Sequence, residues 1–302
     1  MTMEKRRVVA IGFFDGVHLG HAELLKTVVK RAKELDAVPS VVSLDTHPSV
    51  VLGRDPVPLI NSTADRVWLM KHYYGIEEVI LSHFDAKMQQ MSWESYITDY
   101  LVKELGAVCI VAGSDNRFGA RGEGNAEKLR RKCHELGIGC EIIGMVELEG
   151  VQVHSTLIRE LIAAGDMERA NRYLGHPHVL SHTVTPGKHL GRTLGFPTVN
   201  LAFEPHVIVP AFGVYATRVL LEGSTEIAVT NVGVRPTVEN TDKVNVEGFI
   251  LDYSGDLYGQ TIRMEFYRHL RGERRFESVE ALTAEVMRNA QQTKAYFGKS
   301  FP

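Results

Sequence analysis

Eleven residues decide how the first half of the 302-residue chain folds, and they read Ile11-Gly12-Phe13-Phe14-Asp15-Gly16-Val17-His18-Leu19-Gly20-His21. A short apolar run, 8–11, precedes the turn, and apolar residues at helical spacing follow it over 24–35. This pattern predicts a strand, a glycine-rich turn and a helix. The three glycines of the stretch allow a ligand to approach the backbone closely.

Two histidines, His18 and His21, lie three residues apart where that helix begins. A helix N-terminus offers unpaired N–H groups and a partial positive charge, so it favours phosphate. The stretch therefore predicts a nucleotide triphosphate seated over the turn. The alternative is an ordinary strand-to-helix turn in which the two histidines only cap the helix.

Strand and helix patterns alternate over the first 150 residues. This alternation predicts an α/β fold, with a parallel sheet covered by helices on both faces and ligands beyond the carboxyl ends of the strands. The expected strands are 7–13, 40–45, 78–82, 107–112 and 140–146, and the expected helices are 21–35, 64–74, 92–105 and 125–137.

Composition limits the class of protein. The length makes two domains the default. The formal net charge of -3 excludes a grossly basic nucleic-acid binder, and no apolar run approaches the ~20 residues of a membrane helix. The start lacks a signal-peptide pattern, and the three cysteines Cys109, Cys133 and Cys140 show no Cys-x-x-Cys spacing. We therefore expect a cytoplasmic protein in a reducing compartment, without structural zinc.

The pattern changes after two short helices expected within 155–175, which Gly165-Asp166 interrupts and Gly175 ends. His176-Pro177 marks a boundary, so the predicted domains are 1–178 and 179–302. Short strands separated by turns then predict a closed antiparallel barrel, and a last helix should pack on it. The expected strands are 213–221, 225–232, 244–253 and one around 262–267, and the expected helix is 278–297.

The opening motif resembles the signature of the nucleotidyltransferase superfamily, (T/F)-x-x-H-x-G-H, and its extended form is similar to the flavin adenylyltransferase branch. The resemblance implies a Rossmann-like domain that joins FMN to the AMP part of ATP. It implies catalytic roles for His18 and His21. The ATP-binding residues that it implies in this motif are Gly12, Phe13, Phe14, Asp15, Gly16, His18, Gly20 and His21.

Three further segments carry the same resemblance. Asp45-Thr46-His47-Pro48 and 113–119 match flavin-side loops, which implies flavin binding by His47, Asp115 and Phe118. Asn116 stands where the family has an aromatic residue. His154-Ser155-Thr156-Leu157-Ile158-Arg159 resembles a helix start that binds phosphate. It implies ATP binding by Ser155, Thr156 and Arg159, although His154 and Leu157 depart from the family pattern.

The run 187–200 resembles the riboflavin kinase motif Gly-Arg-x-Leu-Gly-x-Pro-Thr-Ala-Asn. Thr198 and Asn200 are two apart in an extended segment, so their side chains face the same way, and their oxygens are hard ligands suited to Mg²⁺. Residues implied to bind ATP or flavin in this domain are Gly187, Lys188, Gly191, Arg192, Thr198, Asn200 and Arg271. The segment 246–252 resembles the family strand that carries the general base, here Glu247.

The resemblance covers nearly the whole chain, and it is to prokaryotic bifunctional riboflavin kinase/FAD synthetases. It implies a nucleotidyltransferase domain followed by a riboflavin kinase barrel with a C-terminal helix. The expected substrates and products are ATP, riboflavin, FMN and FAD, with Mg²⁺, and we expect neither nucleic-acid nor membrane partners. A homo-oligomer is left open. Two alternatives stay open: a riboflavin kinase with a weakened or inactive first domain, and a flavin-responsive regulatory protein.

Overall fold

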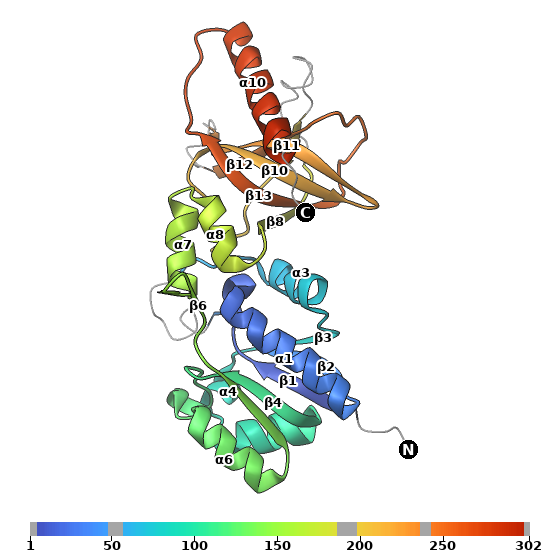
Figure 1. Ribbon diagram of the computed structural model, residues 1–302, viewed down its shortest axis with the longest axis vertical. Coiled ribbons are helices and arrows are strands. Elements are labelled where there is room, and N and C mark those ends of the chain that lie inside the picture. The colour runs from blue at the N-terminus through green and yellow to red at the C-terminus, as the bar shows by residue number, and fades with distance from the viewer. Residues whose placement is uncertain (1–4, 48–56, 186–197, 236–242, 299–302) are drawn as a thin grey trace. The chain divides into compact units, whose positions relative to one another are not determined.

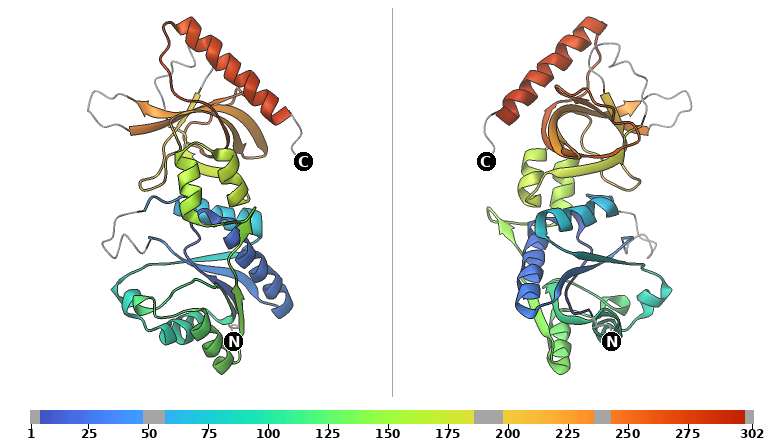
Figure 2. Two further views of the ribbon diagram at one scale, coloured as in Figure 1. Left: turned by 60° about the vertical axis from the view of Figure 1, so that its left-hand side comes forward. Right: turned by 90° about the vertical axis from the view of Figure 1, so that its right-hand side faces the viewer.

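The computed structural model describes residues 5–47, 57–185, 198–235 and 243–298 (Figures 1 and 2). Its contacts divide the chain into two compact units. The first unit comprises Met1–Val57 and Arg66–His154, and the second comprises Pro58–Asp65 and Ser155–Pro302. The functional domain boundary at 178/179 stays a prediction.

The first unit is built on a five-stranded sheet in the order β3-β2-β1-β4-β5, with every pairing parallel. This confirms the predicted parallel sheet. The central strands are apolar along most of their length, which is typical of strands buried on both faces. The strands are β1 Arg7–Ile11, β2 Val38–Leu44, β3 Glu78–Ser82, β4 Ala107–Gly113 and β5 Gly139–Ile143.

Helices occupy the predicted positions between these strands, with one difference in type. The segment expected as one helix over 92–105 is a short α5 followed by η2, a π-helix that ends where Leu105 N donates to the carbonyl of Tyr100. The helical elements are η1 Asp15–Val17, α1 Leu19–Leu35, α3 Thr63–Tyr74, α4 Ala86–Gln90, α5 Trp93–Ser95, η2 Tyr96–Glu104, η3 Ala120–Gly122 and α6 Ala126–Leu136. A small hairpin, β6 Glu147–Leu148 and β7 Val151–Gln152, follows.

The second unit holds a six-stranded antiparallel sheet in the order β8-β13-β10-β11-β12-β9. Its two edges meet at a bridge between Thr185 and Asn200, where Thr185 N donates to Asn200 O at 3.0 Å. The sheet therefore curls into the predicted barrel, visible end-on in the right panel of Figure 2. The strands are β8 His178–Thr183, β9 Thr198–Leu201, β10 Gly213–Leu221, β11 Ser224–Arg235, β12 Lys243–Ile250 and β13 Thr261–Arg271.

Three helices complete the second unit: α7 Ser155–Ala163, α8 Met167–Leu174 and α10 Val279–Gly298. The break between α7 and α8 and the end of α8 at Gly175 are as predicted, with Gly165 and Gly175 both at φ near +80°. The final helix α10 packs on β10 and β11, where Ala290 lies against Val214 and Val229.

A segment from the first half of the sequence belongs to the second unit. Leu59 forms a parallel bridge with Val207, and Asn61 donates to the carbonyl of Val179 at 3.1 Å. The buried carboxylate of Asp65 accepts hydrogen bonds from the backbone and the hydroxyl of Ser181. Sequence reasoning did not predict this segment. No helix in the described parts of the chain is long and apolar enough to cross a membrane.

Two candidate active sites

The glycine-rich turn after β1 is tightly wound and buried. Gly16 adopts φ +78°, and two residues with side chains, Phe14 and Val17, also have positive φ values of 60° and 43°. Such backbone is rare for a bulky or β-branched residue, and it costs on the order of 1–3 kcal/mol per residue. Phe14 and Val17 are 1% and 0% exposed, so packing holds them in this conformation. Stored strain of this kind clusters at functional sites.

The two histidines of the motif lie together at the start of α1. His18 is the N-cap residue of the helix but makes no side-chain capping hydrogen bond. Its ring instead stacks on that of His21, with centroids 3.7 Å apart and planes 19° apart. A Cβ on Gly20 would lie 3.1 Å from the His18 ring, so any larger residue at this position would crowd the stack. The alternative in which the histidines only cap the helix therefore has no support from His18.

Burial keeps His21 neutral. Desolvation, followed by the charges of His18 and Arg66, holds the pKa of His21 well below its usual value. A neutral imidazole at the helix N-terminus can donate a hydrogen bond to a phosphate oxygen without the cost of burying a charge.

A cavity of about 710 Å³ opens beside this turn in the first unit. Gly12, Phe13 and Phe118, which the sequence analysis selected, line it. The sequence analysis missed several other lining residues, which come from the ends of β2 and from segments 84–96 and 116–122. They include Ser43, Leu44, Phe84, Tyr96 and Arg121. Asn116, which the sequence analysis noted as a departure from the family pattern, also lines the cavity.

The walls of this cavity carry aromatic rings. Tyr96 and Phe118 have ring centroids 5.6 Å apart. The half-buried His47 is not among the described residues that line the cavity, but its ring meets that of the lining residue Phe13 edge-on at 4.7 Å. Asp115, in contrast, is exposed and is not among the described residues that line the cavity. Its proposed flavin contact therefore gains no geometric support, whereas that of Phe118 does. Flat apolar walls of this size suit a ring system.

The helix start at 155–159 lies in the second unit. Ser155 is the first residue of α7, and Arg159 Nη1 lies 3.5 Å from the hydroxyl of Thr156. A hydroxyl, helix N–H groups and a guanidinium are thus combined, as the phosphate-binding interpretation requires. Their part in an ATP site stays a prediction.

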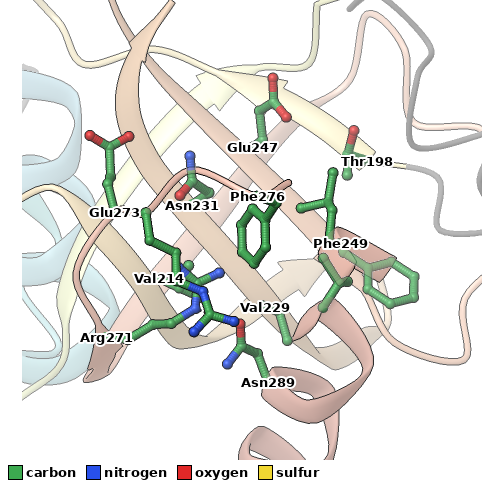
Figure 3. Close-up of a pocket in the computed structure, with 13 residues that line it drawn as sticks. Thr198, Val214, Val229, Asn231, Glu247, Phe249, Arg271, Glu273, Phe276 and Asn289 are labelled. Atoms are coloured by element: carbon green, nitrogen blue, oxygen red, sulfur yellow. The ribbon is translucent and has the colours of Figure 1, made fainter. Parts of the chain in front are cut away.

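A second candidate site lies on the outer face of the barrel, under α10, in a cavity of about 320 Å³ (Figure 3). Strand register builds it. Glu247 on β12 faces Asn200 on β9 and Asn231 on β11, and Val214 on β10 faces both Asn231 and Arg271. Five strands thus contribute to one row, and Glu247, Asn231 and Arg271 line the cavity.

Hydrogen bonds hold the polar side chains of this row. Asn245 Nδ2 donates to Glu247 Oε1 at 2.9 Å, so this half-buried carboxylate is oriented from its own strand. Arg271 Nε donates to Asn289 Oδ1 at 3.1 Å and lies 3.4 Å from Glu285, both on α10. Six lining residues were not among the predicted site residues: Asn231, Phe249, Glu273, Arg274, Phe276 and Asn289.

Thr198 links this cavity to a neighbouring one of about 350 Å³. The neighbour is lined by the β12–β13 connection, including Tyr253, Asp256 and Tyr258. Asn200, two residues on, is 4% exposed and is not among the described lining residues of either cavity. The other residues predicted for this site, Gly187, Lys188, Gly191 and Arg192, lie outside the described residues.

Comparison with known proteins assigns both units. A family model for FAD synthetase matches residues 1–157, and one for riboflavin kinase matches residues 174–297. Curated relatives from Listeria monocytogenes and Escherichia coli, each called a bifunctional riboflavin kinase/FMN adenylyltransferase, are 32% identical. They cover 97% and 98% of this chain and 93% and 94% of their own length. A crystal structure described as a macrolide-efflux protein from Streptococcus pneumoniae covers 97% of this chain and 95% of its own, with TM-score 0.83 and 28% identity.

The parallel-sheet unit and the barrel unit, together with the two family models that match them, define an enzyme with two catalytic domains, a nucleotidyltransferase and a kinase. The chain belongs to the family of bifunctional riboflavin kinase/FMN adenylyltransferases. Both domains are present, which supports the bifunctional enzyme over a kinase alone or a regulatory protein.

Proposed function

We propose that the barrel domain (179–302) transfers the γ-phosphoryl group of ATP to the 5′-hydroxyl of riboflavin, and that the first domain (1–178) then joins FMN to AMP. The products are FMN and ADP from the first step, and FAD and pyrophosphate from the second. The observation that carries the kinase half is the position of Thr198, which lines both cavities of the barrel. Two substrates in these cavities would meet beside it.

In this assignment riboflavin occupies the cavity with Glu247, and ATP occupies the one lined by Tyr253 and Asp256. Glu247 accepts the proton of the attacking hydroxyl, and its hydrogen bond from Asn245 keeps it oriented. Arg271 supports the flavin side of the cavity.

Magnesium fits the oxygens available here. Thr198, which carries a hydroxyl, lines both cavities, and Asn200, two residues further along β9, would present a second hard oxygen on the same face of the strand. When bound, the cation would supply positive charge to neutralise the phosphates of ATP.

For adenylyl transfer, the helix start with His18 and His21 would receive the phosphates of ATP, and the cavity with Phe13 and Phe118 would receive the flavin. The FMN phosphate attacks the α-phosphorus, and pyrophosphate leaves. No covalent enzyme intermediate is needed, because positioning and charge stabilisation suffice. Ser155, Thr156 and Arg159 at the start of α7 would bind phosphate of ATP through a hydroxyl, N–H groups and a guanidinium. We further propose a cytoplasmic location.

The test follows riboflavin, FMN, FAD and pyrophosphate over time with ATP and Mg²⁺. Glu247→Gln should lower kinase turnover roughly 10²- to 10⁴-fold, the typical range for a general base, and leave FAD formation from supplied FMN unchanged. His21→Ala should do the reverse. Loss of both activities in either variant would refute two separate sites, and a wild type that makes FMN but no FAD would reduce the protein to a kinase.

A further inference from the structure

Arg66 stands out among the charged residues of the first unit because it is buried. It is 1% exposed, and among the described residues it is the only lysine or arginine in the buried class. Burying a guanidinium costs several kcal/mol unless its donors are well satisfied. A hydrophobic side chain of similar volume would avoid that cost, so the retention of an arginine here calls for a specific reason.

The donors of Arg66 reach the ends of two neighbouring strands. Nη1 donates to the carbonyl of Phe13 and lies 3.3 Å from the Ser43 hydroxyl, and Nη2 donates to the carbonyl of Leu44 at 3.0 Å. The Ser43 hydroxyl itself donates to the Phe13 carbonyl at 3.0 Å. The guanidinium also lies 4.1 Å from the centre of the Phe13 ring. One side chain thus fixes the end of β1 to the end of β2.

All three partners of this guanidinium, Phe13, Ser43 and Leu44, line the 710 Å³ cavity. Phe13 also belongs to the turn that leads to the two histidines. A planar guanidinium can bond two carbonyls at once, whereas an ammonium is a single point charge. The wall of the cavity and the direction in which the chain leaves β1 therefore both depend on Arg66.

We propose that Arg66 is a positioning residue for adenylyl transfer: it clamps the ends of β1 and β2 and thereby fixes the cavity wall against which the flavin lies. The proposal rests on the function proposed above for the first domain. Arg66 acts through Phe13 and Leu44 rather than by touching the reacting phosphates.

The charge of Arg66 has a second effect, on His21. Burial lowers the pKa of Arg66 to about 10, so the guanidinium remains charged at neutral pH. The groups that shift the pKa of His21 downward, besides its desolvation, are His18 and Arg66. Removing the cation should therefore raise the pKa of His21, so that His21 takes up a proton at a higher pH than in the wild type.

The test compares Arg66→Met and Arg66→Lys in the full chain, with Arg31→Met as a matched control. Arg31 lies on α1, pairs with Glu34 and Glu141, and does not line the cavity. We measure kcat/KM for FMN adenylylation between pH 5.5 and 9, and kinase turnover in the same samples.

Arg66→Met should lose on the order of 100-fold in kcat/KM for adenylylation, because a displaced wall misplaces the substrate. The acid limb of its pH profile for kcat/KM should also move to higher pH. Arg66→Lys should lose about tenfold and keep the acid limb in place, because it keeps the charge but not the double clamp. Kinase turnover should stay at the wild-type level in both, and Arg31→Met should change neither activity.

Wild-type rates in both Arg66 variants would overturn the proposal. Equal losses with an identical acid limb would overturn it as well, since they would show a packing role alone. If Arg66→Met fails to fold, the proposal is tested on Arg66→Lys alone, by its decrease in kcat/KM and by its pH profile. A wild type that forms no FAD would instead refute the proposed function. The clamp would then be tested by FMN fluorescence quenching, where an unchanged affinity in Arg66→Lys would refute it.

Discussion

Replacing Glu285 by Gln should weaken the kinase cavity without touching the proposed base. The side chain of Glu285 is 6% exposed and forms ion pairs with three arginines: Arg271 at 3.4 Å, Arg274 at 2.6 Å and Arg288 at 2.7 Å. Arg271 and Arg274 line the cavity that contains Glu247. The substitution keeps the shape of the side chain and removes only its charge.

The magnitude follows from the exposure of each partner. Arg274 and Arg288 are 48% and 63% exposed, so solvent screens these pairs and each contributes at most about 1 kcal/mol. Arg271 is only 20% exposed, and at 3.4 Å its gross attraction to Glu285 is about 5 kcal/mol at an effective dielectric constant near 20. Two effects offset more than half of the summed attraction: the substitution removes the cost of burying a carboxylate, and the amide oxygen of Gln can still accept a hydrogen bond. The free energy of unfolding should therefore fall by about 2 kcal/mol.

Urea unfolding should show this loss in the second unit as a midpoint lower by about 1 M, for an m-value near 2 kcal/mol/M. The KM for riboflavin should rise about tenfold with little change in kcat, because Arg271 loses its support while Glu247 keeps its own. Asp252→Asn is the matched control, since Asp252 and its partner Lys294 are 78% and 49% exposed. An unchanged midpoint together with an unchanged KM would refute the argument.

Three further outcomes are expected. Gly119→Ala should abolish FAD formation and spare the kinase, because Gly119 has φ +72° and a Cβ there would lie 2.6 Å from Trp93 Cα. Burial lowers the pKa of His178 to about 3, so the unfolded chain binds the extra proton between pH 6.5 and 3 and stability falls as pH falls through that window. His178→Phe should therefore lose less stability than the wild type when urea unfolding is compared at pH 7 and pH 4. Thr198→Val should raise the Mg²⁺ concentration for half-maximal kinase rate roughly tenfold, with adenylylation measured alongside as the control.

The elements of both units could be read from the sequence because their signals are local. Apolar runs such as 8–11 predicted strands that are buried on both faces, and glycines such as Gly165 and Gly175 predicted where helices stop. The position of His18 at the start of a helix could likewise be predicted from the neighbouring residues alone. In the barrel, the exposed and buried alternation around Met264 predicted a strand that the structure contains as β13.

The kinase cavity could be predicted only in part, because register is not a local property. Glu247, Asn231 and Arg271 meet through pairings that a one-residue slip of any strand would break, since it would turn the side chains to the other face. Asn289 comes from a helix packed over the row. The position of the segment 58–65 is harder to predict, because Asp65 and Ser181 are 116 residues apart in the sequence and no local pattern indicates their contact.

The departure at Asn116 illustrates how the fold can replace a missing motif residue. The side chain at this position lines the cavity, and its Nδ2 donates to the carbonyl of Ile11 at 3.3 Å, which ties the loop to the end of β1. Aromatic surface comes instead from Tyr96, on the π-helix η2, whose ring lies beside that of Phe118. Relative to the family motif, Asn116 lacks an aromatic ring. The cavity nevertheless contains the rings of Tyr96 and Phe118, and the hydrogen bond of Asn116 holds the loop in place. Stacking area for a flavin is therefore a property of the cavity wall, and its source in the sequence can shift from one segment to another.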